Sequence, residues 1–116
     1  MVLYNGDLVS VLKVTLVDPF GEVKRVSCQA VVSASKTLKT DFHLNASGLL
    51  APLAKGCLGH QQNKVRAAGI EAVGAVMVGS RDGDDLKSVI SHLAQRLFDP
   101  VPAVRLQVWT LPQLSI

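Results

Sequence analysis

The chain has 116 residues and a mass of 12.3 kDa, which leaves room for one domain and excludes most large enzymes. Hydrophobic residues make up 48% of the sequence and charged residues 18%, so the composition favours a folded protein and argues against disorder. The formal net charge is +3, but the basic residues are scattered without a long run. We therefore favour a solvated basic surface over a nucleic-acid interface, which stays an alternative.

Cys28 and Cys57 are too few for a disulfide framework and form no C-x-x-C motif. We expect buried, reduced thiols, which are typical of a protein of the cytosol or the nucleus. No apolar run approaches the roughly 18 residues of a membrane span, and the first residues lack the pattern of a secretory signal. The sequence therefore predicts a cytoplasmic protein with no membrane partner.

An internal repeat is the most informative feature of the sequence. Segments 12–24, 54–66 and 93–105 align without gaps, and their valine anchors are 42 and 39 residues apart. Each anchor is followed by a cation and stands five residues after a turn residue. A period of this length is typical of stacked helical units. The anchors are Val23, Val65 and Val104, the cations are Lys24, Arg66 and Arg105, and the turn residues are Asp18, His60 and Asp99.

Helical periodicity before and after each anchor predicts two helices in each unit. The Asp18-Pro19 and Asp99-Pro100 pairs end the first helices, because a residue before proline avoids the α conformation and aspartate accepts hydrogen bonds from nearby backbone amides. Pro102 suits the first turn of the helix that follows. We predict three antiparallel pairs, over residues 7–17 with 21–34, 43–58 with 62–78, and 85–98 with 102–111, connected by residues 35–40 and 79–85.

Leu-x-x-Leu, Asp-Pro and Val-Arg at this spacing, followed by small residues such as Gly69 and Ala72, resemble the HEAT repeat in three copies. Pro52 is similar to the proline that often bends the first helix of this repeat. The resemblance implies an all-α fold, an α-α superhelix (HEAT-type solenoid) of three antiparallel helix pairs. Residues 1–116 then form a single HEAT-repeat segment, with repeats at about 7–34, 43–78 and 85–111 and an irregular tail at 112–116, where Pro112 breaks the pattern.

The stretches TLVDP (15–19) with EVKR (22–25), and SHLAQRLFD (91–99), resemble more closely the HEAT-repeat dynein axonemal assembly factors of ciliated eukaryotes. This resemblance implies a cytoplasmic, non-catalytic scaffold for the preassembly of axonemal dynein arms. Its implied partners are axonemal dynein chains and chaperones or co-chaperones, and the chain is implied to be a fragment or a short isoform of a longer array. The alternatives are a general HEAT adaptor in transport or phosphatase complexes and a nucleic-acid-binding HEAT module.

Catalytic and metal motifs are absent from the sequence. His43, His60 and His92 have no ligand spacing, and none is followed by glutamate, unlike the His-Glu pairs of the di-iron deoxyhypusine hydroxylases that share this architecture. No phosphate-binding glycine loop and no nucleophile motif occurs. We therefore predict no enzyme activity, no cofactor and no metal.

Solenoids bind their partners along extended faces that successive helices form. We expect the exposed positions of the second helices to make these contacts. Trp109 on the last helix is a further candidate, because tryptophan is favoured at binding hot spots, although the favoured role of this side chain is packing in the core or between repeats. The candidate partner-binding residues are Lys24, Arg25, Gln29, Arg66, Glu71 and Trp109.

Charged residues at the turns are expected to form a structural ladder between units. In HEAT arrays the turn aspartate of one unit often pairs with the cation of the next. This predicts that Asp18 meets Arg66 and that Arg105 faces His60, so that Asp99 is left without a following partner. The ladder residues are Asp18, Arg66, Asp99 and Arg105.

Overall fold

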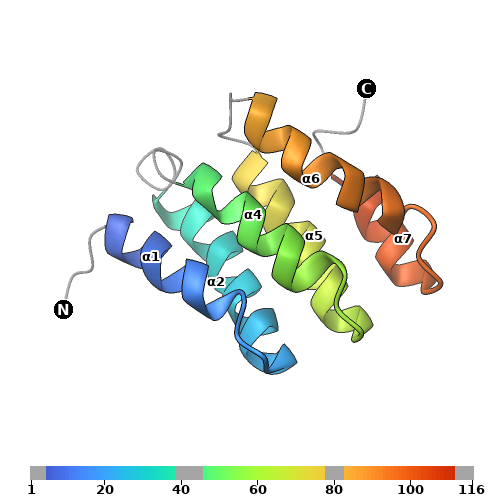
Figure 1. Ribbon diagram of the computed structural model, residues 1–116, viewed down its shortest axis with the longest axis horizontal. Helices are drawn as coiled ribbons and strands as arrows, with labels where there is room; N and C mark the ends of the chain where they lie inside the picture. Colours follow the sequence, from blue (N-terminus) through green and yellow to red (C-terminus); the bar gives the residue numbers. More distant parts are fainter. Residues whose placement is uncertain (1–4, 39–45, 78–82, 112–116) are drawn as a thin grey trace.

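The computed structural model describes residues 5–38, 46–77 and 83–111, and the regular secondary structure in these ranges is entirely helical (Figure 1). The expected all-α class is therefore confirmed. His43 and the tail predicted at 112–116 lie outside the described residues. The elements are α1 (Asn5–Thr15), α2 (Gly21–Leu38), the 3-10 turn η1 (Ala46–Leu49), α4 (Leu50–Leu53), the π-helical turn η2 (Ala54–Leu58), α5 (Asn63–Met77), α6 (Gly83–Arg96) and α7 (Pro102–Trp109).

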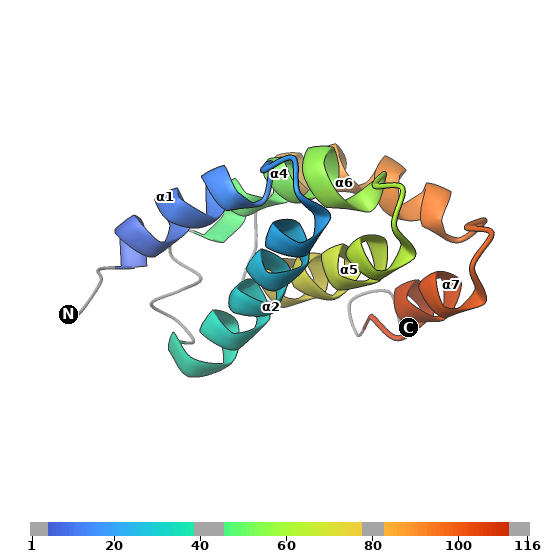
Figure 2. The ribbon, with the colours of Figure 1, turned by 90° about the horizontal axis from the view of Figure 1, so that it is seen from below.

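The helices lie in two layers. Figure 2 shows α1, α4 and α6 in a first layer and α2, α5 and α7 in a second. Helix α5 is central, because it packs against α2 and α7 within its own layer and against α4 and η2 in the other. The molecule measures 42 × 34 × 22 Å. Within the described residues, no helix has both the length and the apolar character that a membrane crossing requires.

Each of the three turns that connect the two layers contains the same kind of hydrogen bond, from a backbone N–H to the side chain two residues earlier. Oδ1 of Asp18 and Oδ1 of Asp99 each accept from the backbone N–H two residues later, both at 2.9 Å. At the equivalent position of the middle unit, Nδ1 of His60 accepts from the N–H two residues later at 3.1 Å. The expected bonding of the two aspartates to local amides is therefore confirmed. His60 makes the same bond although its side chain is chemically different.

Pro52 interrupts the first helix of the middle unit. Residues 46–58 pass from a 3-10 turn through one α turn to a π-helical turn. Proline has no N–H and its ring crowds the preceding turn, so regular α hydrogen bonding cannot run through it. The irregular helix is the structural counterpart of the bend expected at Pro52.

Several helix bounds differ from the predicted ones by one or two residues, as in α1, which spans Asn5–Thr15 and not 7–17, and the largest difference is at the end of α2. Helix α2 continues to Leu38, whereas the pattern placed its end at residue 34 and a connection at 35–40. Residues 35–40 contain neither glycine nor proline, so no residue of this stretch would end the helix at position 34. The hydroxyl of Ser35 donates to the carbonyl of Val32 at 2.8 Å, within the same helix. Helix α6 begins at Gly83, inside the connection predicted at 79–85.

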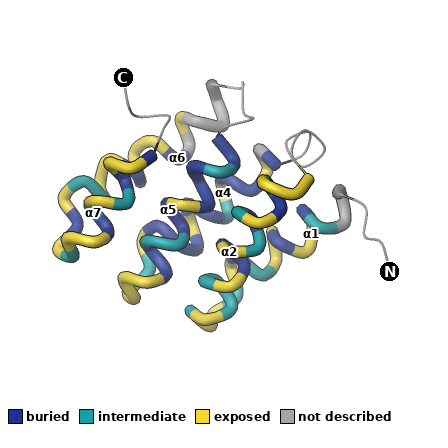
Figure 3. Tube along the Cα trace, turned by 180° about the vertical axis from the view of Figure 1, so that it is seen from behind, coloured by how far each residue is buried: buried dark blue, intermediate teal, exposed yellow. Residues whose placement is uncertain are grey.

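Aliphatic and small side chains of both layers form one core. Figure 3 shows that burial is concentrated along α4 and α5, the central elements of the two layers. A Cβ added at Gly69 would lie 2.8 Å from the Cβ of Cys57, so this glycine permits α5 to approach η2 closely. The largest fully buried side chains are Leu16, Val31, Leu49, Leu50, Leu53, Leu58, Val65, Ile70, Val73, Val76 and Val89.

The two cysteines are free and buried, as the sequence predicts. Sγ of Cys28 on α2 donates to Sγ of Cys57 in η2 at 3.6 Å, and Sγ of Cys57 approaches the carbonyl oxygen of Leu16 at 3.8 Å. The hydrogen bond to Cys57 and burial together raise the pKa of the Cys28 thiol. Both sulfurs therefore pack as small apolar groups between the first two units.

Gly56 in η2 generates a stability prediction. A Cβ at this position would collide with the carbonyl oxygen of Leu16, a backbone atom that cannot turn away as a flexible side chain would. We expect Gly56→Ala to lower the free energy of unfolding by about 1–3 kcal/mol, measured by urea denaturation followed by circular dichroism. The control is Gly59→Ala, where φ is −105° and an added Cβ has nothing within 4 Å. Equal loss in the two variants would contradict the close approach at Gly56.

Candidate functional site

A groove crosses all three helices of the second layer, and we name it the second-layer groove. Its cavity volume is about 270 Å³. Two half-buried alanines of α5 contribute its apolar lining, and polar and charged side chains of α2, α5 and α7 make up the rest. The lining residues are Arg25, Gln29, Lys64, Ala67, Ala68, Glu71 and Gln107.

The charges of the groove are mixed. Arg25 and Lys64 are cationic, whereas Glu71 is anionic and exposed. Arg25 also forms an ion pair with Glu22 one turn earlier on α2. The hydrogen bond from Arg25 lowers the pKa of Glu22, and the same bond raises the pKa of Arg25, so both groups stay charged at neutral pH. A groove lined by two alanines and by charges of both signs suits a polar protein segment better than a uniformly anionic backbone.

The structure brings together three of the six candidate partner-binding residues. Arg25, Gln29 and Glu71 all line the second-layer groove. Lys24 and Arg66 do not line it, because they point into the junctions between units. Trp109 lies on α7 with 70% of its surface exposed, close in sequence to the exposed Leu106, but it is not part of the groove lining.

The other groove residues are not among the candidates that the sequence pattern indicated. Lys64, Ala67, Ala68 and Glu71 are spaced as one face of a helix, and this 3-4-7 rhythm begins one residue before the anchor Val65. Choosing that face would have found Lys64 and excluded Arg66, which lies two positions further on. No comparable signal marks Gln107.

Arg66 lies in the junction between the second and third units. Its Nε and Nη2 donate to the two carboxylate oxygens of Asp99 at 2.8 and 3.1 Å, a two-point ion pair in which the side chains are 9% and 0% exposed. Its Nη1 donates to the carbonyls of His60 and Gln61 at 2.7 and 2.9 Å. Arg96 completes the site, because its Nη1 lies 2.8 Å from Asp99 Oδ2.

The predicted pairing of Asp18 with Arg66 is therefore wrong. The ladder runs in the opposite direction, since the cation of one unit reaches forward to the turn aspartate of the next. The expectation that Asp99 has no partner is wrong for the same reason. Arg105 donates to the carbonyl of Asp99 in its own turn, as Arg66 does to His60, and it does not pair with His60.

Lys24 makes the equivalent forward contact at the first junction. Its ammonium donates to the carbonyl of Gly56 at 2.8 Å, so α2 is tied to η2 of the middle unit. The acceptor is a neutral carbonyl, whereas Arg66 meets a buried carboxylate. In both junctions the cation that follows the valine anchor makes the contact, but its acceptor is neutral in the first junction and charged in the second.

Among the described residues, no group of three or more His, Cys, Asp or Glu side chains could hold a metal ion. His60 is engaged in its turn, and Nδ1 of His92 is buried without a hydrogen-bond partner. Burial, and then the positive charges of Lys24 and Arg66, lower the pKa of His60, so this ring is neutral at pH 7.

Comparisons with known proteins identify relatives of this chain. The family model described as "Dynein axonemal assembly factor 5-like, TPR repeats" matches residues 1–112. Dynein axonemal assembly factor 5 of Homo sapiens is 41% identical over 99 residues, and that of Mus musculus is 42% identical over 100 residues; each match covers 85% of this chain and 11% of the relative. The protein of the same name from Xenopus laevis is 38% identical over 102 residues, which cover 88% of this chain.

The chain spans only 11–12% of the length of these curated relatives. No solved structure matches it.

The pKa of Asp99 generates a pH prediction. Burial alone raises this pKa, but the hydrogen bonds from Arg66 and the Val101 N–H and the charges of Arg66 and Arg96 outweigh burial, so the pKa lies below its usual value. A carboxyl with a lowered folded pKa contributes stability above its unfolded pKa of about 3.9 and loses it as pH falls through the folded value. We expect Asp99→Asn to lower the free energy of unfolding at pH 7 by about 3–5 kcal/mol.

We also expect Asp99→Asn to flatten the decline of stability between about pH 4 and pH 2, measured by urea denaturation at each pH. Glu22→Gln is the control, because its carboxyl also has a lowered pKa but is exposed. An acid sensitivity unchanged by Asp99→Asn would contradict the assigned role of this ion pair.

Proposed function

The chain belongs to the dynein axonemal assembly factor 5-like family, and we propose that it is a non-catalytic protein-binding scaffold that takes part in the cytoplasmic preassembly of axonemal dynein arms. The observation that carries the proposal is the second-layer groove, which crosses three successive helices on one face. The names of the relatives indicate that the process is the assembly of axonemal dyneins, and the groove is the proposed binding surface. Extended faces of this kind are the binding surfaces of helical repeat proteins.

The proposed architecture is a HEAT-type solenoid of three antiparallel helix pairs, with repeats at about 7–34, 43–78 and 85–111. Three features support it: the two helical layers, the same turn hydrogen bond at Asp18, His60 and Asp99, and the forward contacts of Lys24 and Arg66. The family description names TPR repeats, which have a period of 34 residues. The anchor spacings of 42 and 39 residues are closer to the HEAT period of about 40–47.

The proposed partners are axonemal dynein chains, with chaperones or co-chaperones that act on them. In this proposal a polar segment of the partner lies in the second-layer groove and pairs with Arg25, Lys64 and Glu71. Gln29 and Gln107 provide neutral donors and acceptors at the two ends of the groove. The exposed Trp109 and Leu106 form an apolar patch on α7 that extends the contact beyond the groove.

Glu71 separates this proposal from the nucleic-acid alternative. A carboxylate beside the cations of the groove repels a phosphate backbone, whereas it pairs readily with a lysine or an arginine of a protein. The general adaptor alternative uses the same surface, and the partners that bind distinguish it from the assembly-factor role.

Affinity capture from the cytosol of ciliating cells tests the proposed function. We expect the tagged chain to enrich axonemal dynein chains, identified by mass spectrometry, and the double variant Arg25→Glu, Lys64→Glu to lose at least tenfold of this enrichment because two of its ionic contacts are reversed. Lys36→Glu is the matched control, since it reverses an exposed charge on α2 outside the groove.

Cytosol from non-ciliated cells is the second control. Undiminished capture of dynein chains by the double variant would exclude the groove as their contact surface. Recovery of the same partners from both cell types would instead favour the general adaptor.

A further inference from the structure

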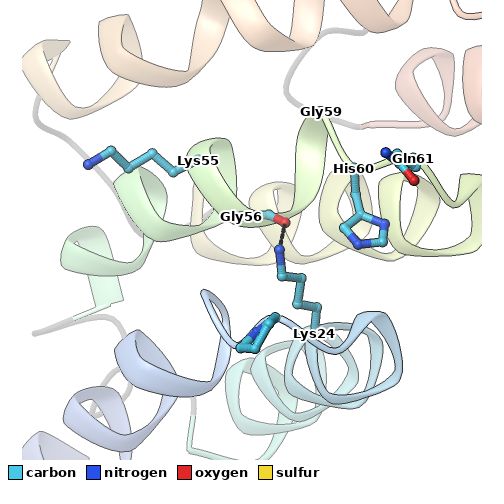
Figure 4. Close-up of a pocket in the computed structure, with 7 residues that line it drawn as sticks. Lys24, Lys55, Gly56, Gly59, His60 and Gln61 are labelled. Atoms are coloured by element: carbon cyan, nitrogen blue, oxygen red, sulfur yellow. Dashed lines mark hydrogen bonds between the residues drawn. The ribbon is translucent and has the colours of Figure 1, made fainter.

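A second pocket lies beside the turns of the first two units, and we name it the turn pocket (Figure 4). Its cavity volume is about 440 Å³. It is formed where the turn before α2 meets the loop between η2 and α5. The lining residues are Pro19, Lys24, Lys55, Gly56, Gly59, His60 and Gln61.

Hydrogen-bond donors face this pocket. In Figure 4, Lys24 rises from α2 toward the carbonyl of Gly56, and His60 extends from the loop toward α2. The bond between Lys24 and Gly56 uses one of the three N–H donors of the ammonium and fixes its position. Nδ1 of neutral His60 accepts a hydrogen bond, so Nε2 carries the proton and is a donor.

The charge around the turn pocket is positive. Lys24 and Lys55 are cations, and none of its seven lining residues is acidic. The side chain of Lys55 is exposed and extends away from Lys24 along the rim in Figure 4, where its flexible stem leaves the ammonium free to turn toward a ligand. Arg66 holds the loop in place through its bonds to the His60 and Gln61 carbonyls, while its charge is paired with Asp99.

Two helix N-termini reinforce this potential. Helix α2 begins at Gly21, two residues after Pro19, and α5 begins at Asn63, two residues after Gln61. The first turns of both helices carry partial positive charge. Glu22 is the acid in the first turn of α2, and it is engaged by Arg25.

We propose that the turn pocket binds the phosphate group of a phosphorylated side chain on a protein partner. The two lysines of the lining can bind phosphate as point charges, and a helix N-terminus also favours a compact dianion. The second-layer groove lies within reach of the same partner, because a polar depression lined by Gln61 and Lys64 adjoins both cavities. The proposal adds a site to the groove function and stands independently of which partner the groove binds.

Fluorescence anisotropy with labelled alanine-rich peptides tests the turn pocket at pH 7.5, where phosphoserine is mostly dianionic. The three probes carry phosphoserine, serine or glutamate at one position. We expect the intact chain to bind the phosphoserine peptide at least tenfold more tightly than the other two, and inorganic phosphate to compete with it.

The variants are Lys55→Gln, which changes an exposed side chain, and Lys24→Met, with its fold checked by circular dichroism. Each is expected to weaken phosphopeptide binding at least threefold, whereas Lys13→Gln on α1 is the control and leaves it unchanged. Equal affinity for the three peptides would overturn the proposal, and so would a Lys55→Gln variant that binds as tightly as the intact chain. Equal binding of the glutamate and phosphoserine peptides would also overturn it, because the pocket would then bind any anion and would not select phosphate. None of these outcomes depends on capture of dynein chains.

Discussion

The guanidinium of Arg66 joins the turns of the second and third units. It is buried and holds the carboxylate of Asp99 and the carbonyls of His60 and Gln61 at the same time. A buried charge that loses its partner costs several kcal/mol, roughly 3–5 in measured cases. The turns of the second and third units are therefore fixed relative to each other, and α5 and α7 are held in one layer.

The proposed binding surface consists of residues that the junctions between units leave exposed to solvent. Because Lys24 and Arg66 are used in the junctions, the neighbouring positions of α2 and α5 face solvent, and Arg25 and Lys64 become available for a partner. The turn pocket has the same origin, since the contact of Lys24 with Gly56 brings the loop that carries His60 over the start of α2. One set of cations thus connects the units and another set faces the groove.

The sequence predicts the helices, the turns and the family, because these depend on local periodicity and on Asp-Pro chemistry. It does not predict the direction of the ladder. Equivalent positions such as Asp18 and Asp99 can be recognised from spacing, but the stagger between neighbouring units decides whether an arginine reaches back or forward. Successive residues on a helix are about 100° apart. The repeat pattern pointed to Arg66, the residue after the buried Val65, as a surface residue, whereas Lys64, the residue before Val65, lies on the groove face. Such a choice needs three-dimensional packing.

In the proposed function, the second-layer groove contacts axonemal dynein chains. Site-specific photo-crosslinking in the cytosol of ciliating cells tests it most directly, with a photoreactive amino acid placed at Gln29 in the groove or at the exposed Val14 on α1 in the other layer. We expect covalent adducts with dynein chains from position 29 and none from position 14. Adducts from position 14 alone, or equally from both, would contradict it.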